Sequence, residues 1–264
     1  MIGQPGRGDW MANGSLWIGT SWKMNKTRDE ARQWASAMTT VAFSERLQPF
    51  VIPPFTSIAP VAEALAGSRL LVGAQNMHWA EAGAWTGEIS AAMIRDCGAT
   101  MVELGHSERR ANFGETDETV ALKVATALRH GLTPLICIGE TAAEKADGRA
   151  DEVLDHQVRM ALSSVPADYR QSTVLLAYEP VWSIGEGGTP ATAAYAGERH
   201  AAIARVAQET LGRPVPCLYG GSVNAGNCRD YVDQPGIDGL FIGRSAWQAD
   251  GYLKIVGLCA DACA

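Results

Sequence analysis

The chain has 264 residues, which suits either one domain of barrel size or two ordinary domains. Hydrophobic residues make up 47% of it and charged residues 19%, a composition that is normal for a folded enzyme and excludes a disordered chain. The formal net charge of −7 argues against nucleic acid or an anionic membrane as the main ligand. Any phosphate site must therefore be built locally, from backbone N–H groups and one or two cations.

The N-terminal segment and the cysteines bear on where the protein works. Residues 1–15 contain glycine, proline and charged residues without an apolar core, so we predict a flexible lead and no signal peptide, with Met11 as an alternative start to Met1. No apolar run approaches the ~20 residues of a membrane span. Cys137 and Cys217 lie within apolar runs, and no CxxC pair or zinc spacing occurs. We expect reduced thiols in a cytoplasmic protein that needs no metal and no cofactor.

Eight short runs rich in Val, Ile and Leu alternate along the chain with longer segments of helical period. Their near-continuous hydrophobic character is typical of strands buried on both faces, as in a parallel sheet. Helix starts between them include two capping boxes, Thr27 with Glu30 and Thr141 with Glu144. The expected strands are residues 16–19, 50–52, 70–72, 100–104, 133–138, 174–178, 215–219 and 239–242.

Each expected strand is followed by helical or turn-rich sequence, and no linker or shift in composition interrupts the series. We therefore predict a single α/β catalytic domain over residues 16–264, an eight-stranded parallel (β/α)₈ TIM barrel with outer helices. Periodicity alone leaves an open, doubly wound sheet of eight units as the alternative. In a barrel, the chemistry lies where strands end at the C-terminal face. That face would collect one lysine, one histidine, two glutamates and three glycine-rich turns.

The residues at these strand ends stand in stretches that resemble the triosephosphate isomerase family. The matching stretches are WKMN at 22–25, LGHSERR at 104–110, AYEPVW at 177–182, YGGSV at 219–223 and the strand at 238–243. The likeness runs in the family's order over about residues 16–258. It implies a barrel that isomerises a phosphorylated ketose substrate through an enediol(ate). Residues 75–88 resemble the long third loop that reaches a neighbouring subunit, which implies a homodimer.

The resemblance also implies a role for each group that handles the proton. Glu179 matches the base that removes the proton from the carbon beside the carbonyl, and His106 matches the neutral imidazole that polarises the carbonyl. Lys23 matches the cation that offsets the charge of the phosphate and the enediolate, and Glu108 the carboxylate that organises the lysine. The residues also suit this chemistry on their own, because proton abstraction needs a carboxylate base, an electrophile and an anion anchor.

The phosphate end is implied in the same way. Backbone N–H groups at Gly185, Ser222, Gly243 and Arg244 resemble the family's phosphate cradle, and residues 180–189 resemble the lid that closes over it. An arginine beside the cradle could add a charge-assisted contact from its guanidinium, or only its backbone N–H could be used. We favour the backbone contact, because the family has a glycine at this position.

Three positions depart from the family's pattern. Ser21 stands where the family normally has an asparagine, Arg244 replaces the second glycine of a pair, and residues 184–189 lack the lid's usual lysine. These changes resemble a branch that converts L-erythrulose 1-phosphate to D-erythrulose 4-phosphate in erythritol breakdown. That substrate is dihydroxyacetone phosphate with a hydroxymethyl group in place of one hydrogen on the reacting carbon. A serine at position 21 leaves more room for this group than an asparagine.

Two other functions compete with this interpretation. The chain could be a triosephosphate isomerase, which interconverts dihydroxyacetone phosphate and D-glyceraldehyde 3-phosphate in glycolysis and gluconeogenesis, with Ser21 as a neutral change. It could also be a barrel that binds sugar phosphates as a sensor without catalysis. We disfavour the sensor, because it would have no reason to keep a base, an electrophile and a lysine together.

Overall fold

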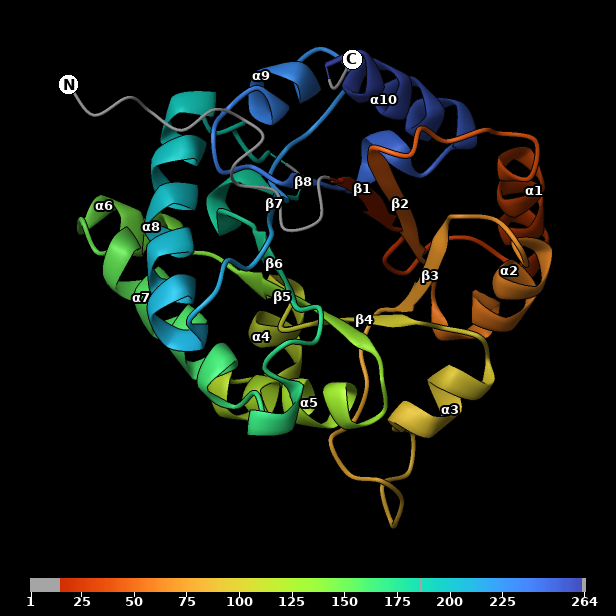
Figure 1. The fold of residues 1–264 in the computed structure, drawn as a ribbon, viewed down its shortest axis with the longest axis horizontal. Coiled ribbons are helices and arrows are strands. Elements are labelled where there is room, and N and C mark those ends of the chain that lie inside the picture. Colours follow the sequence, from red (N-terminus) through yellow and green to blue (C-terminus); the bar gives the residue numbers. More distant parts are fainter. Residues whose placement is uncertain (1–14, 186, 263–264) are drawn as a thin grey trace.

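A computed structural model of the chain describes residues 15–185 and 187–262. In this part of the chain, eight parallel strands close into a barrel in the order β1 to β8, and helices surround the barrel (Figure 1). The pairing of β1 with β8, Trp17 opposite Gly239, closes the sheet and excludes the open alternative. The predicted TIM barrel is confirmed. The predicted flexible lead falls mostly on residues 1–14, which lie outside the described residues.

The strands are β1 (Leu16–Ser21), β2 (Leu47–Ile52), β3 (Leu71–Ala74), β4 (Met101–Leu104), β5 (Thr133–Ile138), β6 (Leu175–Tyr178), β7 (Cys217–Tyr219) and β8 (Gly239–Ile242). The α-helices are α1 (Arg28–Met38), α2 (Ile58–Ala64), α3 (Ala91–Asp96), α4 (Ser107–Phe113), α5 (Asp117–Arg129), α6 (Ala142–Ala146), α7 (Ala150–Ser163), α8 (Ala193–Leu211), α9 (Cys228–Val232) and α10 (Ala249–Ala262). The 3₁₀ turns within the described residues are η2 (Phe55–Ser57), η3 (Ala167–Tyr169), η4 (Val181–Ser183) and η5 (Arg244–Ala246).

Several strand ends differ from the sequence prediction: β2 begins earlier, at Leu47, β3 runs over Leu71–Ala74, and β4 and β6 each begin one residue later. The differences at β1 and β7 have a physical reason. β1 runs two residues further than expected, because Thr20 and Ser21 continue the pairing with β2 as far as Ser21 opposite Ile52. β7 begins at Cys217 rather than at residue 215, because Pro216 has no N–H group to donate to the sheet. The first of these differences matters for function, since it makes Ser21 the last residue of a strand.

The interior of the barrel is packed with apolar side chains, as the near-continuous hydrophobic strands predicted. Buried side chains from most of the strands fill it, and a second apolar layer lies between the strands and the outer helices. The predicted capping boxes at Thr27 and Thr141 both form. The interior cluster consists of Phe50, Ile52, Met101, Leu135, Cys137, Leu175, Ala177, Leu218 and Phe241.

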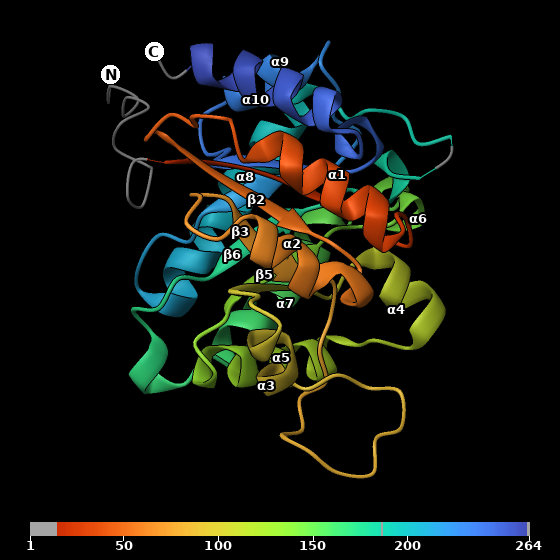
Figure 2. The same ribbon diagram turned by 90° about the vertical axis from the view of Figure 1, so that its right-hand side faces the viewer.

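One segment extends well beyond the barrel. The connection between β3 and α3 leaves the body of the molecule as a long loop (Figures 1 and 2). Its rings pack on one another, with the centre of the His78 ring 4.0 Å from that of Trp79 and 4.2 Å from that of Trp85. Trp85 is nevertheless 48% exposed. Within the described residues, no helix combines the length and the apolar character that a membrane span requires.

Candidate active site

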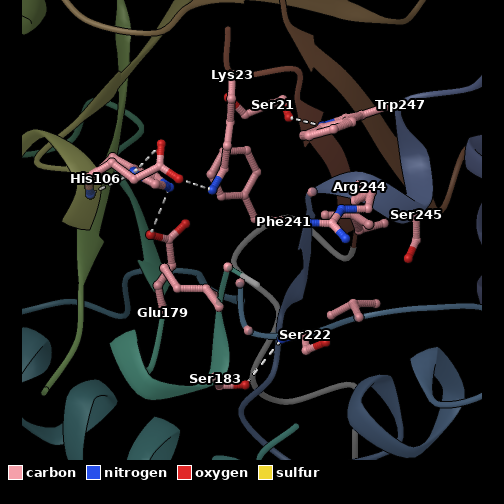
Figure 3. Close-up of a pocket in the computed structure, with 18 residues that line it drawn as sticks. Ser21, Lys23, His106, Glu179, Ser183, Ser222, Phe241, Arg244, Ser245 and Trp247 are labelled. Carbon is pink, nitrogen blue, oxygen red and sulfur yellow. Dashed lines mark hydrogen bonds and ion pairs between the residues drawn. The ribbon is translucent and has the colours of Figure 1, made fainter. Parts of the chain in front are cut away.

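A cavity of about 420 Å³ opens where the parallel strands end at their C-terminal side (Figure 3). Parallel pairing brings every β-to-α connection to the same end of the barrel, so residues far apart in sequence meet there. The structure brings all the residues proposed for the site around this one cavity. They are Ser21, Lys23, His106, Glu108, Glu179, Gly185, Ser222, Gly243 and Arg244.

His106 is held in one orientation between β4 and α4. Its Nδ1 accepts a hydrogen bond from the backbone N–H of Glu108, at 3.1 Å, so the proton of the neutral ring is assigned to Nε2. Burial, and after it the charge of Lys23, lowers the pKa of His106 to about 4. The imidazole is therefore neutral near pH 7, and Nε2 can donate a hydrogen bond to a substrate oxygen.

Glu179 follows β6 and faces this imidazole, with its Oε2 3.5 Å from His106 Nε2. The carboxyl is buried, and Oε2 has no hydrogen-bond partner within the described residues. Burial, reinforced by the charge of Glu103, raises the pKa of Glu179 well above its usual value. An unsatisfied buried carboxylate is costly for stability, and its raised pKa makes it a stronger base than an ordinary glutamate.

Two glycines make room for Glu179. A Cβ added to Gly220 would lie 2.7 Å from Glu179 Cγ, and one added to Gly139 would lie 1.9 Å from the Glu179 carbonyl oxygen. Any larger residue at either position would displace the carboxylate. These glycines come from the connections after β7 and β5, so the barrel closes tightly around the base from both sides.

Lys23 provides one of the positive charges at the cavity. Its backbone adopts a left-handed conformation with φ of 51°, which is unfavourable for a residue with a side chain. The Gln75 side chain holds this conformation by donating to the Lys23 carbonyl at 2.9 Å. Nζ donates to Glu108 Oε1 at 2.6 Å, which is the pairing expected for Glu108. The ammonium is thereby fixed beside His106.

The end of the cavity expected to bind phosphate lies across from His106 and Glu179 (Figure 3). Gly185 has φ of 83°, a conformation that favours glycine, and Gly243 directly precedes η5. The Ser222 N–H is engaged in this structure, since it donates to Ser183 Oγ at 3.3 Å. Arg244 is exposed and lines the cavity, so its guanidinium is available to an anion there.

The segment proposed as the lid, residues 180–189, is anchored at its start and contains one residue, 186, outside the described part. Trp182 Nε1 donates to Glu140 Oε1 at 2.8 Å, and Lys145 Nζ lies 3.4 Å from the centre of the Trp182 ring. Glu140 is fully buried and also accepts from Tyr178 and Tyr195. Sequence reasoning missed Glu140, whose carboxylate fixes the first turn of the segment.

Sequence reasoning also missed Glu103, a buried carboxylate on β4 beside His106. Glu103 Oε2 accepts a hydrogen bond from Ser21 Oγ at 2.9 Å, and Oε1 lies 4.0 Å from His106 Nε2. A signal was present in the sequence, because Glu103 is the one charged residue in the strand Met101–Leu104. The same argument that singled out Glu179 after an apolar strand applies to it.

A neutral imidazole beside a basic carboxylate, at the mouth of a barrel of this kind, defines an enzyme that moves a proton next to a carbonyl group. The chain belongs to the triosephosphate isomerase family, whose model matches residues 16–259. It is 60% identical to L-erythrulose-1-phosphate isomerase of Brucella abortus, over 93% of this chain and 96% of that protein. The proteins of the same name from Rhizobium etli (60% identity, 91% of each chain) and Rhizobium meliloti (57%, 96% of this chain and 100% of that protein) are similar relatives.

Proposed function

We propose that this protein isomerises L-erythrulose 1-phosphate to D-erythrulose 4-phosphate. The observation that carries the proposal is the 60% identity to relatives of that name over more than nine tenths of both chains. The cavity has the groups that this reaction needs, namely a base, a neutral electrophile, a fixed cation and an open phosphate end. Ser21, where the family normally has a larger asparagine, lines the same cavity.

The reaction follows from the positions of His106 and Glu179. The Glu179 carboxylate removes the proton from the carbon that bears the hydroxymethyl group, and the electron pair forms the carbon–carbon double bond of the enediol(ate). His106 Nε2 donates to the carbonyl oxygen, then moves the proton between the two oxygens. Glu179 returns its proton to the former carbonyl carbon, which completes the exchange. Lys23 and the phosphate end hold the anion in place throughout.

The test of this substrate assignment compares the wild-type enzyme and Ser21→Asn on L-erythrulose 1-phosphate and dihydroxyacetone phosphate. Wild type should prefer the four-carbon substrate in kcat/KM. Ser21→Asn should lower kcat/KM on the four-carbon substrate by about 10–200-fold and affect the triose much less, because one clash or lost hydrogen bond costs ~1–3 kcal/mol. An equal loss on both substrates would indicate a general disturbance of Lys23. A wide preference of wild type for the triose would contradict the proposal.

We also propose that the protein acts in the cytoplasm as a homodimer. Cys97, Cys137, Cys217 and Cys228 are free thiols, and the last three are buried, which suits a reducing compartment. Exposed apolar side chains occur on the loop after β3, directly after Lys23 and at the end of α4, where Trp85 is 48%, Met24 96% and Phe113 70% exposed. Met24 directly follows Lys23, so a subunit that covers it would also close one side of the site.

The proposed dimer can be tested with one substitution that introduces a charge at the expected interface. Met24→Glu places a carboxylate where the partner would pack, so sedimentation equilibrium should show a shift from dimer to monomer. Leu122→Glu, a matched change at an apolar residue of α5 that is 50% exposed, should leave the dimer intact. Met24 is almost fully exposed, so its replacement should not unfold a single subunit. A fully active wild-type monomer at assay concentration would overturn the dimer.

A further inference from the structure

The Glu103 carboxylate is buried beside Ser21 and His106, on a strand whose other residues are apolar. It is 3% exposed and comes from β4, whose other residues are Met101, Val102 and Leu104. Burial raises the pKa of Glu103 to about 7, and the hydrogen bond from Ser21 opposes that shift. A buried carboxylate costs stability that an aliphatic side chain of similar volume would not. Because Glu103 lowers stability, we expect it to have a role in the neighbouring site.

Glu103 determines which hydrogen-bonding group Ser21 can offer. The Ser21 hydroxyl proton is engaged by Glu103 Oε2 at 2.9 Å, and the Ser21 carbonyl accepts from Trp247 Nε1 at 2.9 Å (Figure 3 shows the second of these bonds). Strand pairing with Ile52 on β2 fixes the backbone as well. A hydroxyl has one proton to donate and two lone pairs. When Glu103 is ionised, Ser21 Oγ therefore presents only acceptor capacity to the cavity that it lines.

We infer that Ser21 Oγ accepts a hydrogen bond from the terminal hydroxyl of the four-carbon substrate, and that Glu103 is the positioning residue that makes Ser21 an acceptor. The inference rests on the proposed function. This hydroxyl is the group that the four-carbon substrate has and dihydroxyacetone phosphate lacks. A bound triose would leave the Ser21 acceptor without a partner in a closed site, which disfavours it.

Glu103 acts through Ser21 rather than on the reacting carbon. Ser21 and Glu179 line the cavity, whereas the buried Glu103 is not among the lining residues and is joined to one of them by the hydrogen bond from Ser21. His106 Nε2 is also nearer to Glu179 Oε2, at 3.5 Å, than to Glu103 Oε1, at 4.0 Å. The base and the electrophile serve both substrates alike. Removing Glu103 should therefore change substrate preference more than it changes the chemistry.

The experiment replaces Glu103 with isoleucine and measures kcat and KM on both substrates. Branched aliphatic residues are the usual filling of a barrel interior, so Glu103→Ile should fold with unchanged or higher thermal stability. We expect kcat/KM on L-erythrulose 1-phosphate to fall at least about tenfold, with the triose value within about threefold of wild type. The ratio of the two values cancels any change in the shared Glu179–His106 pair.

Two further variants separate positioning from structure. Ser21→Ala removes the acceptor with little change in volume and should give the same selective loss, and the double variant Ser21→Ala with Glu103→Ile should lose no more than the larger single loss. Asp238→Asn is the control. Its carboxyl also has a pKa raised to about 7 by burial, but it binds the Cys217 N–H at the start of β7 and should affect both substrates equally.

The outcomes distinguish this inference from the proposed function. If wild type prefers L-erythrulose 1-phosphate and both Glu103→Ile and Ser21→Ala keep that preference, the proposed function stands and the role of Glu103 is wrong. A parallel loss on both substrates, with lowered thermal stability in both variants, would show a purely structural role. If wild type does not convert the four-carbon substrate, the proposed function fails and this inference fails with it.

Discussion

Glu179→Gln should lower kcat at least about 10²-fold and leave binding of the substrate within a few-fold. The amide keeps the shape of the side chain but cannot accept a proton from carbon, and Gly139 and Gly220 leave the same room for it. Steady-state kinetics on the four-carbon substrate, with the competition constant of inorganic phosphate as the measure of binding, separate the two effects. Because burial raises the pKa of Glu179, the wild-type rate should also fall on acidification at a higher pH than an ordinary carboxyl would give.

A control for this variant is Glu209→Gln on the surface of α8, where the carboxylate pairs with Arg159 and Arg205 far from the cavity. It makes the same chemical change and should leave turnover as in wild type. Near-normal turnover in Glu179→Gln would mean that another group is the base. Glu103 would then be the first residue to test, because its carboxylate is the next one from His106 in the interior of the barrel.

His106→Gln should also lower kcat by about 10²-fold or more. A glutamine can still donate a hydrogen bond to the carbonyl oxygen, but it cannot give up a proton and regain it from the neighbouring oxygen. The neutral ring can do both, because its Nδ1 accepts from the Glu108 N–H and its pKa lies well below neutrality. The measurement is kcat at saturating substrate, together with thermal denaturation to show that the variant is folded.

His200 offers a matched control for this second variant. It is also a buried neutral histidine, with a pKa lowered to about 3 by burial, but its Nδ1 pairs with the Gly236 carbonyl at the outside of the barrel. His200→Gln should reduce thermal stability and change kcat by less than about threefold. Comparable losses of turnover in both histidine variants would show that the effect of His106→Gln is general destabilisation.

The fold was predictable because strands that are buried on both faces consist of near-continuous runs of apolar residues. All eight expected strands occur, and β1 ends two residues later than expected because Thr20 and Ser21 are polar but pair with β2. Whether the sheet closes depends on pairing between its first and last strands, which are more than two hundred residues apart. Local periodicity carries no information on that contact.

The members of the site were predictable for a different reason, since parallel strands bring all their following loops to one end. The hydrogen bonds between these residues were not predictable from the sequence. The hydrogen bond from Ser21 to Glu103 joins residues 82 positions apart, and only the closed barrel brings them into contact. Glu103 was missed because it stands inside a strand rather than after one. The sequence indicated only that Ser21 leaves more room than an asparagine. The structure shows in addition that its hydroxyl lines the cavity and donates to Glu103.

The central claim is that the enzyme moves a proton within a four-carbon ketose phosphate, and isotope exchange tests it most directly. Wild-type enzyme is incubated with L-erythrulose 1-phosphate in heavy water, and the products are followed by nuclear magnetic resonance. The account predicts that D-erythrulose 4-phosphate forms and that deuterium enters at the reacting carbons, because the proton held by Glu179 exchanges with solvent. A substrate that binds but gains no deuterium and no product would contradict the account and identify a binding protein.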